Sequence, residues 1–252
     1  LAAVEDNARV TAGGAVSVTA DSHADLNTIA GTAGFGGKAG FGISASVIVH
    51  LDSVTARIGD SAVITALGAD GVKVSALSSE DLLTIAAGAS GGGKVGASGS
   101  AVVNVLSETT RASIGAGARI NEDNTGAHTD QDVTVSAEDF TDIISVAGSA
   151  GLGGSAGIGA GVDVGVITKD TRATIGGSTI VRAADDVGVT ADSSEDIISV
   201  VGNAGVGGKA GIAGSVGVYV DVTQTRAVIG DQAVVEANGD VVVAADGTFD
   251  II

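Results

Sequence analysis

DIISVVGNAGVGGKAGIAGSVGVYVDVTQTRAVIG, residues 196–230, decides the fold of this chain. From Lys209 onward, apolar residues alternate with small or polar residues over about 14 positions, and Val216, Val218 and Val220 share one side. A period of two is typical of a β-strand, in which neighbouring side chains point to opposite faces. The stretch therefore predicts one unusually long strand, which would span roughly 45 Å at about 3.3 Å per residue.

Related text occurs three more times upstream, so the chain is a repeat array. A Val-x-Val-x-Ala motif recurs every 54 to 61 residues, with central valines Val18, Val74, Val135, Val189 and Val243. An Ile-Gly pair follows 40 residues after each of the first four valines, at Ile58, Ile114, Ile175 and Ile229. We interpret residues 1–252 as one continuous array of about four and a half repeats. Its approximate boundaries are 1–17 (partial), 18–73, 74–134, 135–188, 189–242 and 243–252 (partial).

All variation in repeat length falls in the connecting segment after Ile-Gly, where we expect backbone to face solvent. The longest connection contains the polar stretch 121–128 and predicts a loop. Elsewhere the connection predicts two short strands, such as 233–237 and 241–245, separated by an Asn-Gly turn. A further strand is expected to begin after a recurring Asp, as at Asp142. It should end at a glycine corner such as Gly207-Gly208-Lys209.

These features predict an all-β fold, a repeat β-solenoid with long strands and Gly-Gly corners. Stacking the copies about 4.8 Å apart would bury their apolar faces and pair their strand edges. The recurring valines and isoleucines above would then form ladders. The alternative is a stack of long antiparallel β-hairpins that turn at Gly-Gly-Lys. The pattern leaves open whether one copy makes one large coil or about three smaller coils. No atypical end copies are visible, so we expect a segment of a longer array or one covered by neighbouring molecules.

The composition supports a repetitive structural protein. The chain has 41 Gly, no Pro, Cys, Met or Trp, and 2% aromatic residues, yet 44% of it is hydrophobic. Its formal net charge of −18 argues against nucleic acid as a partner, because phosphate binding needs clustered Lys and Arg. No apolar run reaches the roughly 18 residues of a membrane helix, so we expect no membrane insertion. No targeting signal is recognisable in the segment.

The best candidate site is an Asp that recurs seven residues after each central valine, at Asp25, Asp81, Asp142, Asp196 and Asp250. Stacked carboxylates repel one another, so each would have a raised pKa, bind a cation or pair with an arginine. Arg111, Arg172 and Arg226 are the possible partners. Alternatively, each Asp caps the backbone at the start of a strand. Calcium is the metal that such a ladder would take, but the glycine corners lack the Asp of calcium-binding β-rolls. We otherwise expect no cofactor.

Nothing in the sequence predicts an enzyme. The Gly-Gly-Lys corners at Lys38, Lys94 and Lys209 resemble a phosphate loop, but neither Ser nor Thr follows the Lys. The three histidines, His23, His50 and His128, occupy different repeat positions and so do not form one site. No nucleophile, base or metal set converges, and no catalytic residue is predicted.

Two copies carry a resemblance to a known family: SSEDLLTIAAGASGGGKVGASGSAVVNVLSETTRASIG (78–115) and the copy at 193–230. They resemble the repeats of very large bacterial exoproteins, the leukotoxin-type filamentous adhesins, which are secreted through an outer-membrane partner. The resemblance covers nearly the whole chain. It implies a β-solenoid stalk outside the cell or on its surface, and it assigns no binding or catalytic residue here.

The sequence therefore predicts a structural extracellular protein, the stalk or filament of a bacterial adhesin or exoprotein, whose copies stack on one another or on flanking repeats. A host or neighbouring cell surface is a further expected partner. The alternative is a binding module that recognises a carbohydrate or a host surface. It would use the connecting loops or an exposed strand face that carries Ser44, Ser46, Ser98, Ser100, Tyr219 and Thr223.

Overall fold

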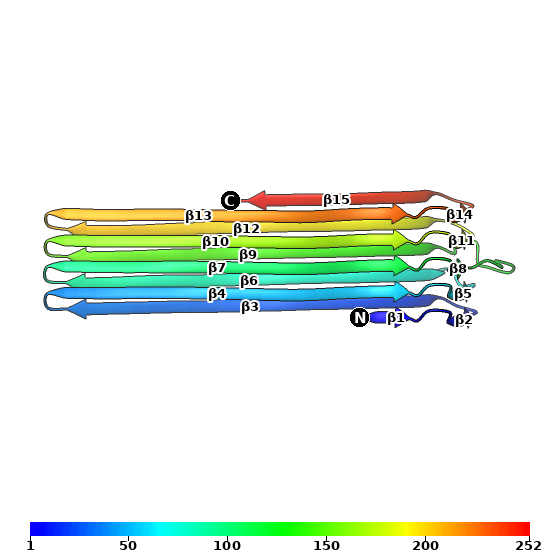
Figure 1. Ribbon diagram of the computed structural model, residues 1–252, viewed down its shortest axis with the longest axis horizontal. Helices are drawn as coiled ribbons and strands as arrows, with labels where there is room; N and C mark the ends of the chain where they lie inside the picture. Colours follow the sequence, from blue (N-terminus) through cyan, green and yellow to red (C-terminus); the bar gives the residue numbers. More distant parts are fainter.

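The computed structural model describes residues 1–252 and consists of fifteen β-strands with no helix. Each repeat forms one turn of a solenoid: a short strand, a long outgoing strand, a glycine corner and a long returning strand (Figure 1). Residues 63–114 give one such turn, with strands β5 (Val63–Ala66), β6 (Val72–Gly92) and β7 (Val95–Ile114). The predicted all-β solenoid is confirmed, and one copy makes one large coil.

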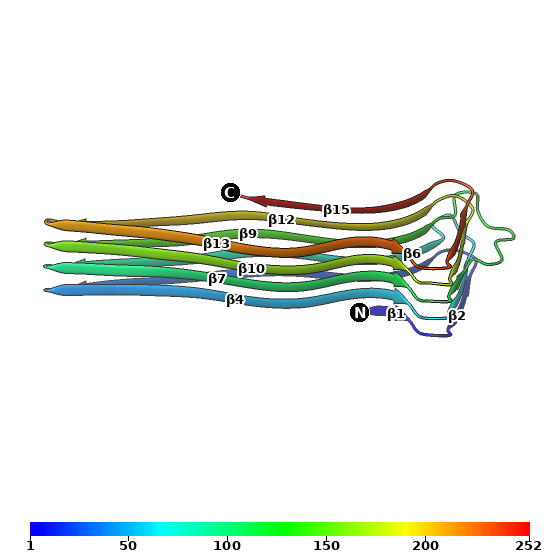
Figure 2. The same cartoon turned by 45° about the horizontal axis from the view of Figure 1, so that its top comes forward.

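Equivalent strands of successive turns form three sheets of five strands. The outgoing sheet contains β3 (Val16–Gly36), β6, β9 (Val133–Gly153), β12 (Val187–Gly207) and β15 (Val241–Ile251). The returning sheet contains β1 (Ala2–Val4), β4 (Ala39–Ile58), β7, β10 (Ala156–Ile175) and β13 (Ala210–Ile229). The end sheet contains β2 (Arg9–Ala12), β5, β8 (Arg119–Ile120), β11 (Ile180–Ala183) and β14 (Val234–Ala237). Figure 2 shows the two long sheets as separate layers, joined at one end by the end sheet.

Every pairing between neighbouring strands is parallel. The two long strands of a turn run in opposite directions but belong to different sheets, so the alternative of stacked antiparallel hairpins is wrong. The register places like residues opposite one another: Val135 pairs with Val74 and Val189, and Ile114 pairs with Ile58 and Ile175. Val18, Val243 and Ile229 continue these two ladders at their ends.

The outgoing strand is longer than the sequence analysis predicted. Residues 241–245 are not a separate short strand but the first part of β15, and β9 begins at Val133, nine residues before Asp142. Residues 137–142, which lie between, alternate buried with more exposed positions, as a continuous strand does. The predicted glycine corners connect the long strands, with Lys38, Lys94 and Lys209 at their tips.

The interior near the end sheet is an apolar core of 26 buried residues, all of them Val, Ala or Ile. A layer of six Ile and Leu side chains crosses the solenoid farther along the long strands, at Ile48, Leu82, Leu106, Ile143, Ile167 and Ile197. Repetition lets these modest side chains pack fully, because each one lies on its equivalent in the next turn. Between the two apolar layers lies a band of buried polar residues, described below.

The part of the solenoid far from the end sheet reverses the pattern of buried apolar residues. We call it the blade, residues 27–51, 83–107, 144–168 and 198–222, and we call the remainder the base. In most of the blade, Gly, Ala and Ser face inward, while Val, Ile, Leu and Phe point to solvent. The inward exceptions include Val102 and the blade members of the apolar layer, Ile48, Leu106 and Ile167. Ser44, Ser46, Ser98 and Ser100 are buried, and Tyr219 and Thr223 lie on the same inward side, so the predicted exposed polar face is wrong.

Size explains why the polar side faces inward in the blade. The two long sheets approach so closely there that a Cβ on Gly151 would lie 2.0 Å from the Ile158 carbonyl oxygen. A Cβ on Gly96 would lie 2.0 Å from the carbonyl oxygen of Leu152, in the same way. Only Gly and other small residues fit between backbones at this distance. The larger apolar side chains are therefore left on the outside.

Candidate functional site

The first place where polar groups converge is the buried band in the base. Lys169 on β10 is almost fully buried, and its Nζ lies 2.7 Å from Asp139 Oδ1, 3.1 Å from Glu195 Oε1 and 3.5 Å from Glu108 Oε2. Asp139 and Glu195 come from the outgoing sheet, and Glu108 comes from β7, next to Lys169 in the register. One ammonium group therefore faces three carboxylates from both long sheets.

A fourth carboxylate, Glu80, completes the band. It accepts a hydrogen bond from Ser78 at 2.6 Å, and Thr141 Oγ1 lies 3.2 Å from Glu108 and 3.4 Å from Glu80. Four acids and one lysine cannot all be charged in a dry interior without a large electrostatic penalty. Burial raises the pKa of Glu80 to about 7 and that of Glu108 to about 8. Although burial lowers the pKa of Lys169, the carboxylates of Asp139, Glu108 and Glu195 raise it above its ordinary value.

The ion pairs of Lys169 with Asp139 and Glu195 link the two long sheets across the interior. Carboxylate oxygens of Glu80, Glu108 and Asp139 lie within 4.8 Å of one another, which is metal-ligand spacing. However, the Lys169 ammonium group already contacts two of these three residues. All of these side chains are sealed between the sheets, so a substrate has no path to them.

Sequence analysis missed this cluster. In the register, Lys169 lies beside Glu108 and Thr223, and Glu108 lies beside Asp52. A lysine that replaces an acid in one repeat is a visible signal, but it carries meaning only once the register is known. The acids of the facing sheet, Asp139 and Glu195, are 26 or more residues away in the chain, so the sequence gives no reason to group them.

The recurring aspartates form a ladder on the outer face of the outgoing sheet. Asp142 pairs with Asp81 and Asp196, and Asp25 and Asp250 extend the ladder at its two ends. Partial burial raises the pKa of Asp142, and the Asp81 and Asp196 carboxylates raise it further. These residues lie in mid-strand, so the interpretation that they cap the start of a strand is wrong.

The arginines do not join this ladder, so the expected Asp–Arg pairing is also wrong. Arg111, Arg172 and Arg226 align with one another on the returning sheet. Arg111 pairs instead with Asp170 at 2.5 Å, and Arg172 donates to the same carboxylate. These two arginines lower the pKa of Asp170 despite its partial burial. Calcium at the aspartate ladder stays a prediction.

The histidines lie apart, as predicted from their repeat positions. His23 lies on the outer face of β3 with its Nε2 3.4 Å from Asp25 Oδ2. His50 belongs to β4 and His128 to the long loop between β8 and β9.

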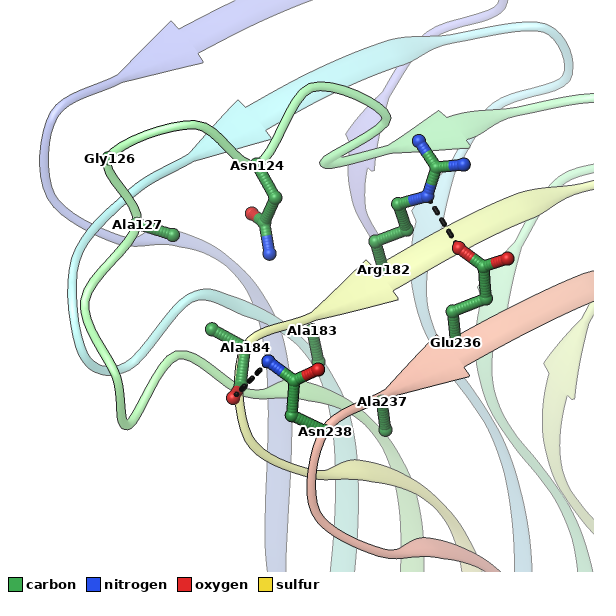
Figure 3. Close-up of a pocket in the computed structure, with 9 residues that line it drawn as sticks. All are labelled: Asn124, Gly126, Ala127, Arg182, Ala183, Ala184, Glu236, Ala237 and Asn238. Carbon is green, nitrogen blue, oxygen red and sulfur yellow. Dashed lines mark hydrogen bonds and ion pairs between the residues drawn. The ribbon is translucent and has the colours of Figure 1, made fainter.

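The predicted loop projects at the end of the solenoid (Figure 1). A shallow hollow of about 310 Å³ lies beside it (Figure 3). Asn124, Gly126 and Ala127 of the loop face the ends of β11 and β14 across it. Arg182 Nε donates to Glu236 Oε2 at 2.7 Å on one side, and Asn238 Nδ2 donates to the Ala184 carbonyl oxygen at 3.2 Å on the other. The hollow is open to solvent and is lined by both polar and apolar residues.

The comparisons with known proteins leave the family open. No protein-family model matches the chain, and no curated protein or solved structure matches it either. The structure has no helix that is long and apolar enough to cross a membrane.

Proposed function

We propose that this chain is a structural repeat protein outside the bacterial cell, part of the stalk or filament of a surface adhesin or secreted exoprotein. Successive turns stack through β-ladders, so the protein's partners are flanking repeats or further copies of itself. The net charge of −18 argues against nucleic acid as a partner. A host or neighbouring cell surface is what such a stalk would reach.

The observation that carries the proposal is the unbroken parallel register of successive turns. Every residue of β12 from Val187 to Gly207 pairs with its equivalent in β9, and the same holds for β10 and β13. Such a stack grows by about 4.8 Å with each turn and needs no change in sequence to grow longer. A fold of this kind is suited to building a long rod rather than to forming a binding pocket.

The buried polar groups also favour a structural role. The Lys169 cluster is closed to solvent, and the exposed aspartate and arginine rows lie on different faces. Catalysis requires a nucleophile or base beside a cavity that a substrate can enter. The resemblance to filamentous adhesins described above agrees with a stalk.

Immunogold labelling of the bacterium that makes the protein tests the proposal. Antibodies against residues 1–252 should label the outside of intact cells, on extensions that negative-stain images show as thin rods. Treatment of intact cells with protease should remove the label. Gold particles confined to the interior of sectioned cells would contradict the proposal.

A second candidate is a binding role at the loop hollow. It is favoured by the amide and guanidinium groups of Asn124, Asn238 and Arg182, because planar polar groups are suited to hydrogen-bonding sugar hydroxyls. A glycan array probed with the purified chain tests this role. Binding should be lost in Asn124→Ala but kept in Asn27→Ala, which lies in the blade far from the hollow. An array without any reproducible hit would rule it out.

A further inference from the structure

The outer face of the outgoing sheet is apolar throughout the blade. Each of its four strands presents five outward-facing residues there, and of these twenty residues only Asn27 is polar. The others are Ile29, Gly31, Ala33 and Phe35; Leu83, Ile85, Ala87, Ala89 and Gly91; Ile144, Val146, Gly148, Ala150 and Leu152; and Ile198, Val200, Gly202, Ala204 and Val206. Val200 is 51% exposed and Val206 58%. An apolar surface of this extent marks an interface.

Two rows of opposite charge bound this apolar face. The aspartate ladder, Asp25, Asp81, Asp142 and Asp196, lies at its base end. The corner residues Lys38, Lys94, Ser155 and Lys209 lie at its tip. In every turn the Asp and the corner residue are 13 residues apart, which is about 43 Å along a strand. No other charged side chain points outward between the two rows.

We propose that this face pairs with the same face of a second copy of the chain, with the strands of the two copies antiparallel. The twofold axis runs along the stacking direction, so each turn faces its equivalent. The Asp row of each copy then meets the Lys row of the other at both ends of the interface. A parallel arrangement would instead place Asp on Asp and Lys on Lys.

The shape of the face fits the same arrangement. A ridge of Ile29, Ile85, Val146 and Val200 lies toward the Asp row, and a trough of alanines lies toward the tip, at Ala33, Ala89, Ala150 and Ala204. A hollow in this trough is lined by residues that include Gly31, Ala87 and Ala89. Antiparallel pairing sets the ridge of one copy over the trough of the other, as in the interdigitated packing of two sheets about 10 Å apart.

The size of the face is that of a stable interface. Four strands about 4.8 Å apart and about 43 Å long present roughly 800 Å² per copy. Specific interfaces bury about 800 Å² on each partner. The Asp and Lys rows at the two edges of the interface determine the relative orientation of the copies more than they add to the affinity.

The other long sheet serves as an internal comparison. The outer face of the returning sheet in the blade is also apolar, from Ala39 to Leu51 in the first turn. Its tip has the same lysines, but its base end has the row of Arg111, Arg172 and Arg226. Asp170 pairs with Arg111 and Arg172, but three arginines against one aspartate leave this row positive, so antiparallel self-pairing of this face would oppose positive charge to positive charge. The charge pattern therefore selects the outgoing sheet as the paired face.

The aspartate ladder gains most from the pairing. Partial burial and the neighbouring Asp81 and Asp196 carboxylates raise the pKa of Asp142, so the isolated chain holds these charges at a disadvantage. Lysines of the second copy would face Asp25, Asp81 and Asp196, and they offset the repulsion along the ladder, although Asp142 itself faces Ser155. Three of the four turns supply such a lysine, and the third supplies Ser155.

Disulfide cross-linking of the purified chain tests the orientation, because the chain has no Cys of its own. Asp81→Cys and Lys94→Cys are made in separate chains. Mild oxidation of the mixture should give covalent dimers of one chain of each kind, whereas either variant oxidised alone should stay monomeric on a denaturing gel. If Asp81→Cys alone forms dimers as fast as the mixture, or if no condition gives dimers, the proposal is wrong.

Sedimentation velocity tests the charge rows without cysteines. The unaltered chain should dimerise at concentrations on the order of 10 µM. Asp81→Lys with Asp196→Lys should weaken the dimer at least about tenfold, and Lys94→Asp with Lys209→Asp should do the same. All four substitutions together should restore it, because the rows are then exchanged. Arg226→Glu on the returning sheet is the matched control and should change nothing.

Circular dichroism confirms that each variant keeps its strand content, which is expected because all of these side chains are exposed. An unaltered chain that sediments as a monomer at ten times this concentration, or a fourfold variant that stays as weak as the twofold ones, would overturn the proposal. Either result would leave the proposed stalk untouched, since stacking within a chain does not need the second copy.

Discussion

The base and the blade are built from the same strands, but they place opposite kinds of residue in the interior. In the base, Val, Ile and Ala point inward and stack into a continuous core, as at Val135 and Ile175. In the blade, Gly and Ser point inward and Val and Ile point outward, as at Val164 and Ile212. The base therefore derives its stability from burial of apolar area, and the blade from backbone pairing between turns.

The difference also separates two roles within one molecule. A buried valine in the base contributes about 25 cal/mol per Å² of apolar surface removed from water. The blade interior contributes less, because several of its buried serine hydroxyls, including Ser98 and Ser100, have no hydrogen-bond partner. Unpartnered buried hydroxyls are destabilising. The outer apolar surface of the blade is available to another molecule instead, which is the basis of the proposed pairing.

The largest expected effect on stability comes from placing a carboxylate in the core of the base, compared with placing one on the outer face of the blade. Val135→Asp puts a carboxylate in the fully buried core and should lower the free energy of unfolding by about 4 kcal/mol or more. Val164→Asp points to solvent on the returning sheet and should lower it by about 1 kcal/mol or less. Urea denaturation followed by circular dichroism measures both. Equal losses for the two variants would mean that Val164 is buried and that the apolar side chains of the blade do not point to solvent.

The next largest effect concerns the one charged layer in the base. Lys169→Met removes the only cation among Asp139, Glu108 and Glu195 and should cost about 3–5 kcal/mol. The loss should be larger at pH 8 than at pH 5, because the carboxylates can take up protons at the lower pH. Lys73→Met, on the exposed outer face of β6, is the matched control and should be nearly neutral. A loss that is independent of pH would contradict this account of the cluster.

The sequence predicts the base well because hydrophobicity and alternation agree there. The spacing of Val74, Val135 and Val189 alone indicates which residues lie on one another. In the blade, the alternation identifies the two faces of each strand but not which face points inward. Side-chain size determines the inward face there, whereas hydrophobicity would predict that the Val and Ile face is buried. The informative signal is glycine at every second position on one face, as at Gly157, Gly159 and Gly161.

The aspartate ladder can be predicted from the sequence, whereas the Lys169 cluster cannot. The ladder joins equivalent positions of successive repeats, so the repeat spacing is enough to find it. The cluster joins two different sheets, so it depends on how far the two long strands of a turn are offset across the interior. That offset follows from the position of the glycine corner and the close contact at Gly151, which only the structure shows.

A smaller effect tests the close approach of the sheets in the blade. Gly151→Ala places a Cβ 2.0 Å from the Ile158 carbonyl oxygen, so the sheets must separate locally, at a loss of about 1–3 kcal/mol. Gly214→Ala on the outer face of β13 meets no atom within 4 Å and is the control. It should be neutral or stabilise the chain by up to about 1 kcal/mol. Equal effects on the urea midpoint would show that the sheets are not in backbone contact.

A pH dependence is expected from the buried carboxylates of the base. Burial raises the pKa of Glu108 from 4.5 to about 8 and that of Glu80 from 4.5 to about 7, so between these limits the folded chain holds more protons than the unfolded chain. The free energy of unfolding should therefore fall as the pH rises from 5 to 8. Glu108→Gln should flatten this fall, and Glu80→Gln in the same chain should flatten it further, whereas the exposed Glu236→Gln should not. A double variant whose urea midpoint still falls as steeply as that of the unaltered chain would show that the protons are held elsewhere.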